Sequence, residues 1–217
     1  MTDMITKSLE PTGLYHHAGA LDNAQQGRIL ETIQRVIDAA PLYVPAMPKS
    51  GKPLSVRMTN CGALGWVTCQ AHGYRYQPDH PVTGEPWPPL PPEILKVWLD
   101  FAGIDAAPEA CLINWYEPGA KLGLHVDRDE QEFIAPVLSI SLGDDAWFRV
   151  GGPKRRDATT RLLLRSGDVI VMGGAARLIH HGIDRIVPGT GDLLPHAGRY
   201  NLTLRRVTPI DPALQAG

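Results

Sequence analysis

The chain has 217 residues, a formal net charge of −2 at pH 7 and 43% hydrophobic residues. This composition is typical of a soluble globular protein with a sizeable core and excludes a membrane span or a strongly basic nucleic-acid binder. The N-terminal residues lack the basic and apolar segments of a secretory signal, and the three cysteines form no C-x-x-C pair. We therefore expect a reducing, cytoplasmic location.

The first 53 residues predict an arm followed by one helix. Residues 1–21 have no clear period and predict a partly extended arm with a short strand near Leu14 and Tyr15. Asp22 can cap a helix, and apolar residues recur at helical spacing over 23–39. Four prolines then mark an irregular stretch up to residue 53.

Residues 54–102 predict short strands, a loop and a second helix. The segments LSVRMTNCG and GWVTC are typical of short strands around a glycine-containing turn. The following GYRYQPDHPVTGEPWPPLPP is rich in proline and aromatic residues, which predicts an irregular loop. Residues 91–102 predict a helix, because proline is tolerated in a first turn and apolar residues line one face.

From residue 110 onward the hydrophobic period shifts toward two. Many short strands separated by glycine-containing turns indicate a sandwich or barrel, and a jelly roll with helices packed on one sheet fits best. No linker or repeat interrupts the sequence, so we expect one domain over 1–217. The expected strands are 110–116, 121–126, 136–142, 145–150, 161–165, 168–172, 177–181 and 198–207.

A candidate metal site lies in the segment NWYEPGAKLGLHVDRDE. If His125 and Asp127 lie on a strand, their side chains point to the same face. One imidazole and one carboxylate supply two ligands of the 2-His-1-carboxylate triad that binds non-haem Fe(II). H-x-D alone is a weak signal, and a surface strand with an ordinary histidine and aspartate is the commoner explanation of the bare pattern. His180 and His181 are the candidates for the third ligand, and spacing does not choose between them.

The last expected strand, RYNLTLR, carries polar residues at alternate positions. Arg199, Asn201, Thr203 and Arg205 share one face, which in a sandwich would ordinarily face solvent. Two arginines on one face can also clamp a dicarboxylate, because guanidinium groups match carboxylates bidentately. A 2-oxo dicarboxylic acid could then chelate iron through its keto and neighbouring carboxylate oxygens while a cation holds its far carboxylate.

Taken together, the motifs resemble those of the AlkB family of Fe(II)/2-oxoglutarate-dependent dioxygenases. The resemblance covers about residues 54–206 and is carried by TNCGALGW, GYRY, LINWYEPGAKLGLHVDRDE, VLSISLGDDAWF, RLLLRSGDVIVMGG, HHGI and RYNLTLR. It implies an α+β, mainly β fold, with a double-stranded β-helix (jelly roll), supporting helices and a nucleotide-recognition lid. The implied parts are an arm and helix (about 1–53), the lid (54–90), the catalytic core (91–207) and a tail (208–217).

The resemblance assigns the iron and cosubstrate residues. His125, Asp127 and His181 match the iron ligands, since the family places the third ligand directly before glycine. Arg199 matches the residue that binds the distal carboxylate of 2-oxoglutarate, assisted by Tyr116. The groups matching other cosubstrate contacts are Asn114, Asn201 and Arg205, with Asn114 and Arg205 near the carboxylate at the iron end.

The resemblance also assigns substrate contacts. Trp66, Tyr74 and Tyr76 match aromatic residues of the lid, which would stack on an extruded base. Asp129 and Arg155 match an acidic–basic pair beside that base. Without the resemblance, the three aromatic residues would be read as structural and the pair as surface charges.

The implied activity is oxidative demethylation of N-alkylated bases such as 1-methyladenine and 3-methylcytosine in DNA. The reaction would consume 2-oxoglutarate and O2 at Fe(II) and release formaldehyde, succinate and CO2. We expect a monomer acting on single-stranded DNA, with RNA left open. Hydroxylation of a small molecule or protein side chain, and a non-catalytic cupin-like binding module, are the alternatives. Cations near the expected site mouth that could contact phosphates are Lys121, Arg128, Lys154, Arg155, Arg156 and Arg161.

Overall fold

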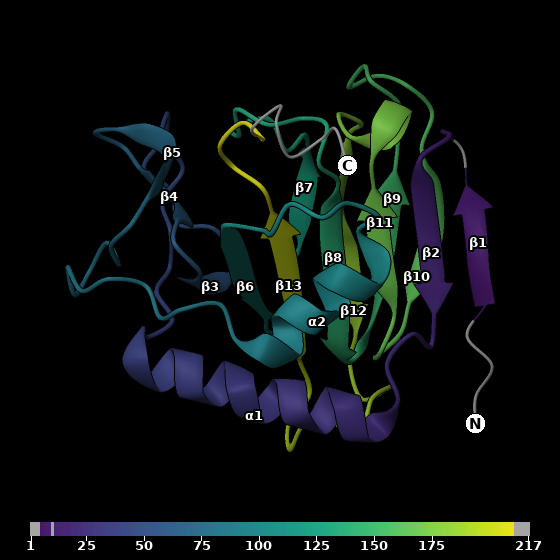
Figure 1. Ribbon diagram of the computed structural model, residues 1–217, viewed down its shortest axis with the longest axis horizontal. Helices are drawn as coiled ribbons and strands as arrows, with labels where there is room; N and C mark the ends of the chain where they lie inside the picture. The colour runs from purple at the N-terminus through teal and green to yellow at the C-terminus, as the bar shows by residue number, and fades with distance from the viewer. Residues whose placement is uncertain (1–4, 10, 211–217) are drawn as a thin grey trace.

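Two β-sheets form the body of the protein. The computed structural model describes residues 5–9 and 11–210. The larger sheet has seven strands in the order β1-β2-β11-β8-β13-β6-β3, and the smaller has four in the order β10-β9-β12-β7 (Figure 1). The larger sheet comprises β1 (Ile5–Leu9), β2 (Leu14–Ala18), β3 (Arg57–Cys61), β6 (Ala110–Tyr116), β8 (Val137–Gly143), β11 (Val169–Met172) and β13 (Arg199–Arg205). The smaller comprises β7 (Leu122–His125), β9 (Asp145–Val150), β10 (Thr160–Leu164) and β12 (His181–Val187).

Two helices cover the outer face of the larger sheet. They are α1 (Asn23–Ala39) and α2 (Pro92–Phe101), and both lie across this sheet in Figure 1. Asp22 caps α1, accepting a hydrogen bond from the Gln25 backbone while the Gln25 side chain accepts from the Asp22 backbone. A core cluster joins the helices to the sheet through residues such as Ile33, Trp98 and Leu202. Both expected helices are thus confirmed, each within one residue of its expected ends.

A second core fills the space between the two sheets. It contains Leu112 and Tyr116 from β6 together with Phe148 from β9 and Ile183 from β12. The face-to-face packing of two antiparallel sheets is the jelly-roll arrangement that the strand pattern predicts. The two cores make β13 a strand with both faces buried.

The polar face of β13 points into this interior. Arg199, Asn201, Thr203 and Arg205 are all buried, whereas Leu202 and Leu204 belong to the core beneath the helices. The reading of this face as solvated is therefore wrong. A row of polar groups between two sheets requires partners inside the protein or in a ligand, because unpaired buried polar groups destabilise the fold.

The hairpin β4 (Gly65–Cys69) and β5 (Gly73–Gln77) forms a separate two-stranded sheet. In Figure 1 it projects from the upper left of the molecule. The expectation of an irregular loop from residue 73 is wrong for Gly73–Gln77, which pairs with β4 in antiparallel register. Gly73 has φ +68°, which allows the tight turn. The tyrosine alternation in GYRYQ was the strand signal, and the prolines after it obscured that signal.

Two other expectations are corrected near the candidate site. The strand expected at 177–181 instead begins at His181, because a 3-10 turn over Gly174–Ala176 and a further turn at 177–178 precede it, and residues 179–180 belong to no regular element. The strand β7 ends at His125, so Asp127 lies beyond it. Residues 211–217, most of the expected tail, lie outside the described part. Neither helix in the described ranges combines the length and apolarity required for a membrane crossing.

Candidate metal and cosubstrate site

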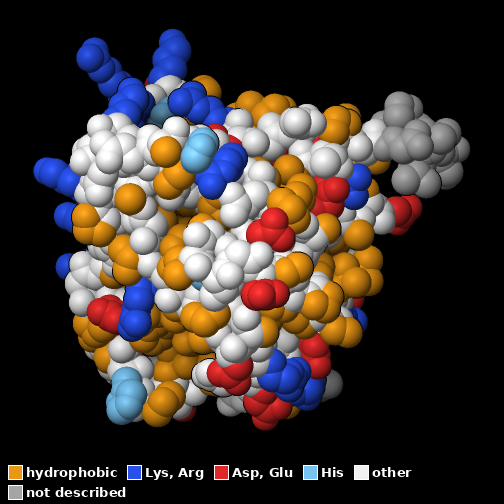
Figure 2. All heavy atoms as spheres, turned by 90° about the vertical axis from the view of Figure 1, so that its left-hand side faces the viewer, with side chains coloured by type: hydrophobic (Ala, Val, Ile, Leu, Met, Phe, Trp, Pro, Cys, Tyr) orange, Lys and Arg blue, Asp and Glu red, His pale blue; other side chains and the backbone are white. Residues whose placement is uncertain are grey.

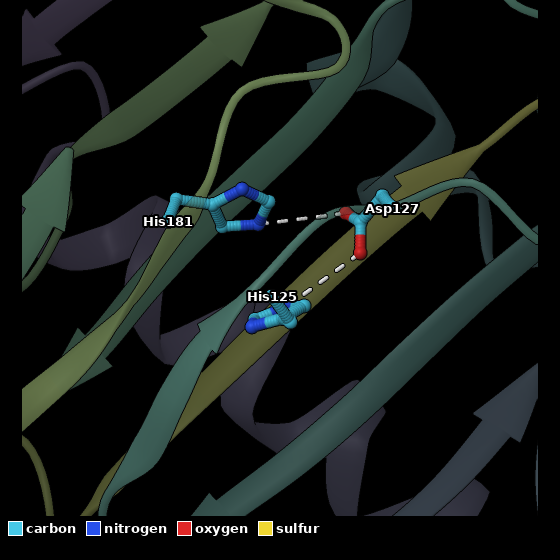
Figure 3. A group of neighbouring side chains, drawn as sticks. All are labelled: His125, Asp127 and His181. Atoms are coloured by element: carbon cyan, nitrogen blue, oxygen red, sulfur yellow. Dashed lines mark ion pairs between the residues drawn. The ribbon is translucent and has the colours of Figure 1, made fainter. Parts of the chain in front are cut away.

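One cluster brings together the side chains of His125, Asp127 and His181. His125 Nε2 lies 3.6 Å from Asp127 Oδ1, and His181 Nε2 lies 3.7 Å from Asp127 Oδ2 (Figure 3). One ligand atom from each residue lies within 4.8 Å of those of the other two. Sequence-distant groups thus meet around one point.

The sheet fixes the two histidines relative to each other. His125 at the end of β7 and His181 at the start of β12 are register partners in an antiparallel pair. Nδ1 of His125 lies 2.9 Å from the Gly123 carbonyl oxygen, and Nδ1 of His181 lies 3.1 Å from that of Ile179. A carbonyl only accepts, so each Nδ1 carries the proton and donates it. Each Nε2 is left with a lone pair facing the carboxylate, as metal-ligating histidines require.

The charge state of the cluster suits metal binding. Burial, reinforced by His125, lowers the pKa of His181 to about 4, so its imidazole is neutral at pH 7. Burial alone would raise the pKa of Asp127, but the neighbouring Arg205, His181 and His125 hold it below its ordinary value. Two imidazoles and one carboxylate form the donor set that binds non-haem Fe(II) and leaves further positions open. The residues present therefore fit the metal.

His180 occupies a different environment. Its Nδ1 lies 3.2 Å from the Gly152 carbonyl oxygen, and it is not part of the cluster that His181 forms with His125 and Asp127. The geometry thus selects the same histidine as the motif before Gly182.

Arg199 is a buried cation that forms no direct ion pair among the described residues, although Asp144, Asp145 and Asp168 act on it from farther away. Its side chain is 0% exposed, and no carboxylate of the described residues lies within 4.0 Å of it. Its Nη1 donates to the Asp144 carbonyl oxygen and its Nη2 to Ser141 Oγ, while Nε has no partner. Burial lowers the pKa of Arg199 to about 10, so the group stays charged at neutral pH. A buried charge with a free donor provides a site for a ligand anion.

Tyr116 and the two asparagines lie in the same interior row. Tyr116 is the β6 register partner of Arg199, and Asn114 is that of Asn201. The Asn201 amide donates to Ser139 Oγ at 2.7 Å and accepts from the Thr203 hydroxyl. Asn114 and Tyr116 are buried beside this strand. The structure therefore brings these expected cosubstrate residues to one wall of the interior.

Arg205 is satisfied by protein carboxylates, unlike Arg199. Its Nη2 donates to Asp127 Oδ2 at 2.8 Å, and its Nε lies 3.1 Å from Glu130 Oε1. The two arginines therefore do not form a symmetrical clamp. Arg205 pairs with the Asp127 carboxylate, whereas Arg199 has no carboxylate of the described residues in direct contact.

The hairpin places its aromatic residues over the segment that follows Asp127. The Trp66 ring stacks on that of Tyr74, with centroids 5.5 Å apart and an interplanar angle of 21°. Trp66 Nε1 donates to Asp129 Oδ2 at 2.8 Å, and the Tyr76 hydroxyl donates to Glu130 Oε1 at 2.5 Å. The hairpin and the metal-bearing segment are thus joined by hydrogen bonds.

The expected ion pair between Asp129 and Arg155 is absent among the described residues. Asp129 instead accepts from Trp66, and Arg155 Nη1 donates to the Leu124 carbonyl oxygen at 2.7 Å. Both side chains are exposed, and each is already held by another neighbour. The pairing prediction is therefore wrong for this structure, and the substrate roles of both residues remain predictions.

Four residues with roles at the site were not singled out from the sequence. Glu130 joins Arg205 to Tyr76, and Arg177 donates to the backbone and side chains of the segment after Asp127. Ser141 and Asp144 hold Arg199. The acidic run D-R-D-E could have pointed to Glu130, whereas the sequence carries no distinctive signal for Arg177.

Comparisons with known proteins identify relatives of this arrangement. The profile of the 2OG-Fe(II) oxygenase superfamily matches residues 13–205. An alpha-ketoglutarate-dependent dioxygenase AlkB homolog of Caulobacter vibrioides is 50% identical over 188 residues, covering 87% of this chain and 84% of that protein. The AlkB dioxygenase of Escherichia coli is 44% identical over 191 residues, covering 86% of each. The solved structure of OsALKBH1 superposes with a TM-score of 0.80 at 30% identity, covering 93% of this chain and 100% of that one.

Proposed function

Because the chain belongs to the AlkB family within the 2OG-Fe(II) oxygenase superfamily, we propose that it oxidatively demethylates N-alkylated bases in DNA. The enzyme is an Fe(II)/2-oxoglutarate-dependent dioxygenase that uses O2. The observation that carries the proposal is a 2-His-1-carboxylate cluster joined by hydrogen bonds to an aromatic hairpin, with a buried arginine that has no ion-pair partner on the interior wall formed by β13. 1-Methyladenine and 3-methylcytosine are the proposed lesions.

The protein's own residues position the reactants. Bound Fe(II) with 2-oxoglutarate and O2 supplies the oxidation of an N-methyl group, with succinate and CO2 as the co-products. The hydroxymethyl product loses formaldehyde and leaves the restored base. His125, Asp127 and His181 would hold the metal, and Arg199 would fix the far carboxylate of 2-oxoglutarate. Packing between the sheets excludes water from this interior.

The hairpin supports a base as the substrate. Catalysis on a base requires its removal from the stack, and flipped bases are held by aromatic faces and polar edge contacts. Trp66 and Tyr74 supply stacked rings, and Asp129 supplies a carboxylate beside them. That carboxylate would favour a base made cationic by methylation. The role of the hairpin as a lid is part of this proposal.

Exposed cations support contact with a phosphate backbone. Lys154, Arg155 and Arg156 are exposed in the turn between β9 and β10, and Lys121 and Arg128 flank the metal segment. Figure 2 shows Lys and Arg side chains gathered along the upper edge on the hairpin side of the molecule. Such contacts position a substrate without reading its sequence. We propose a monomer acting on single-stranded DNA in the cytoplasm, where the three free cysteines would stay reduced.

The proposal is tested by turnover of a defined lesion. The protein is incubated with Fe(II), 2-oxoglutarate and single-stranded DNA containing 1-methyladenine, and formaldehyde and repaired base are measured. Release of both in equal amounts is the expected result. Absence of turnover on methylated DNA and RNA, in protein shown to bind metal and 2-oxoglutarate, would refute the substrate assignment and favour hydroxylation of a small molecule or protein. Failure to bind either would favour the non-catalytic module.

Replacing His125 by alanine should remove activity while the fold survives. The His125 side chain is 35% exposed, so its loss leaves the core intact. Loss of one of three protein ligands should lower kcat by roughly a thousandfold, about 4 kcal/mol of transition-state stabilisation. Formaldehyde release and the thermal unfolding midpoint should be measured together. Retained turnover with an unchanged unfolding midpoint would contradict the ligand assignment.

Replacing Trp66 by alanine should weaken use of the nucleic-acid substrate. Base–aromatic stacking is worth about 1–3 kcal/mol, so kcat/KM for DNA should fall by about 5- to 150-fold while the KM for 2-oxoglutarate stays unchanged. The Trp66→Phe variant keeps a ring but loses the hydrogen bond to Asp129. If this variant is as impaired as alanine, the hydrogen bond and not stacking carries the contribution.

A further inference from the structure

Asp127 is the metal ligand whose position the sheets do not set. His125 and His181 are register partners within the smaller sheet. Asp127 lies two residues beyond the end of β7, in a segment without regular structure. A carboxylate in irregular chain needs other contacts to hold it within the narrow tolerance that a metal site requires.

Arg177 supplies those contacts to the segment that follows Asp127. The residue is 3% exposed and follows the 3-10 turn that leads into β12. Its Nη1 donates to the backbone carbonyl of Asp127 at 2.8 Å, and its Nε donates to that of Ala135 at 3.0 Å. Its Nη2 lies 3.3 Å from Glu130 Oε2 and 3.5 Å from the Glu132 carbonyl oxygen. One guanidinium group therefore contacts the beginning, the middle and the end of the segment 127–135.

Glu130 extends this arrangement to the hairpin. Its carboxylate, in a residue 5% exposed, lies between Arg177 and Arg205, and it also accepts a hydrogen bond from the Tyr76 hydroxyl. Arg205 in turn donates to Asp127 Oδ2. The side chain of Asp127 is thus fixed through Arg205 and its backbone through Arg177, with Glu130 joining the two cations. Two buried cations and two buried carboxylates compensate one another.

We propose that Arg177 is a positioning residue for the metal centre, which sets the location of Asp127 through its backbone. Arg177 stands four residues before His181. The segment that leads to His181 therefore also carries Arg177, the residue that holds Asp127. This role of Arg177 concerns metal binding and not nucleic-acid binding, so its test does not depend on the substrate assignment.

Metal affinity measured without turnover tests the proposal. Co(II) titrations of the full-length protein, followed by calorimetry and by the visible absorption of the bound ion, compare wild type with Arg177→Met, which keeps an apolar stem and removes every donor. Loss of partners that orient a ligand typically lowers metal affinity about 10- to 100-fold, and we expect a decrease in that range with an altered Co(II) spectrum. Arg177→Lys should recover part of the affinity, because one amine can still reach a carbonyl oxygen.

A matched control separates positioning from general destabilisation. Ile33→Ala removes a fully buried side chain of α1, on the far side of the larger sheet, and should lower the unfolding midpoint without changing Co(II) affinity. Unchanged affinity and spectrum in Arg177→Met, or an equal loss in Ile33→Ala, would overturn the proposal. If Arg177→Met does not fold, Arg177→Lys decides: wild-type Co(II) affinity together with a lowered unfolding midpoint would show a purely structural role.

Discussion

Replacing His181 by alanine should abolish demethylation, whereas the same replacement at His180 should leave it nearly unchanged. The two residues are neighbours in the chain, yet only His181 directs Nε2 toward Asp127. A kcat lowered by roughly a thousandfold or more is expected for His181→Ala, since a metal ion contributes several kcal/mol to transition-state stabilisation. Formaldehyde release and Co(II) binding should both be measured.

His180→Ala and His181→Ala are matched controls, because each removes one imidazole from neighbouring positions of the chain. Burial keeps His181 neutral in the absence of metal, with its pKa lowered to about 4, so alanine removes a ligand without removing a charge. Both variants lose one imidazole from the same connection into β12. Loss of Co(II) binding in His180→Ala but not in His181→Ala would reverse the ligand assignment.

Replacing Arg199 by methionine should raise the KM for 2-oxoglutarate by about 100-fold or more, with a smaller effect on metal affinity. A buried ion pair broken on one side costs about 3–5 kcal/mol, and each 1.4 kcal/mol corresponds to a tenfold change. No carboxylate of the described residues lies within 4.0 Å of Arg199, so the uncompensated cation destabilises the ligand-free fold. The unfolding midpoint of the ligand-free variant should therefore be unchanged or higher.

The combination of weaker cosubstrate binding and undiminished stability distinguishes a ligand site from a structural cation. Arg206→Met is the control, because Arg206 directly follows the last residue of β13 but pairs with Glu109 and contacts Thr208. This control should leave the KM for 2-oxoglutarate unchanged. A large loss of stability in Arg199→Met, with an unchanged KM, would show that the arginine serves the fold alone.

Local sequence patterns predict most of the secondary structure because their signals are short in range. The apolar spacing and the Asp22 cap define α1, and alternation defines β6 and β13 nearly to the residue. The start of β12 is different, since a turn at 177–178 and a buried, apolar Ile179 outside any strand occupy residues where a strand was expected. Local hydrophobicity does not distinguish a buried turn from a strand.

The three residues of the candidate metal cluster could also be selected from the sequence, but the way they are held could not. The motif identifies His125, Asp127 and His181, whereas strand spacing gives the wrong reason for Asp127, which lies past the end of β7. The opposite roles of Arg199 and Arg205 depend on which protein carboxylates come near them in the fold. Arg177 meets its partners across at least 42 residues of sequence, and no local pattern encodes such contacts.

Under the proposed role of Arg199, the interior polar face of β13 links cosubstrate binding to the stability of the folded enzyme. A ligand that binds only the folded state shifts the folding equilibrium by mass action, by about 2.7 kcal/mol at a concentration 100 times its dissociation constant. If Arg199 binds 2-oxoglutarate as proposed, the unfolded fraction open to proteases should decrease as the concentration of 2-oxoglutarate rises. The cosubstrate would then lengthen the lifetime of the protein as well as support its turnover.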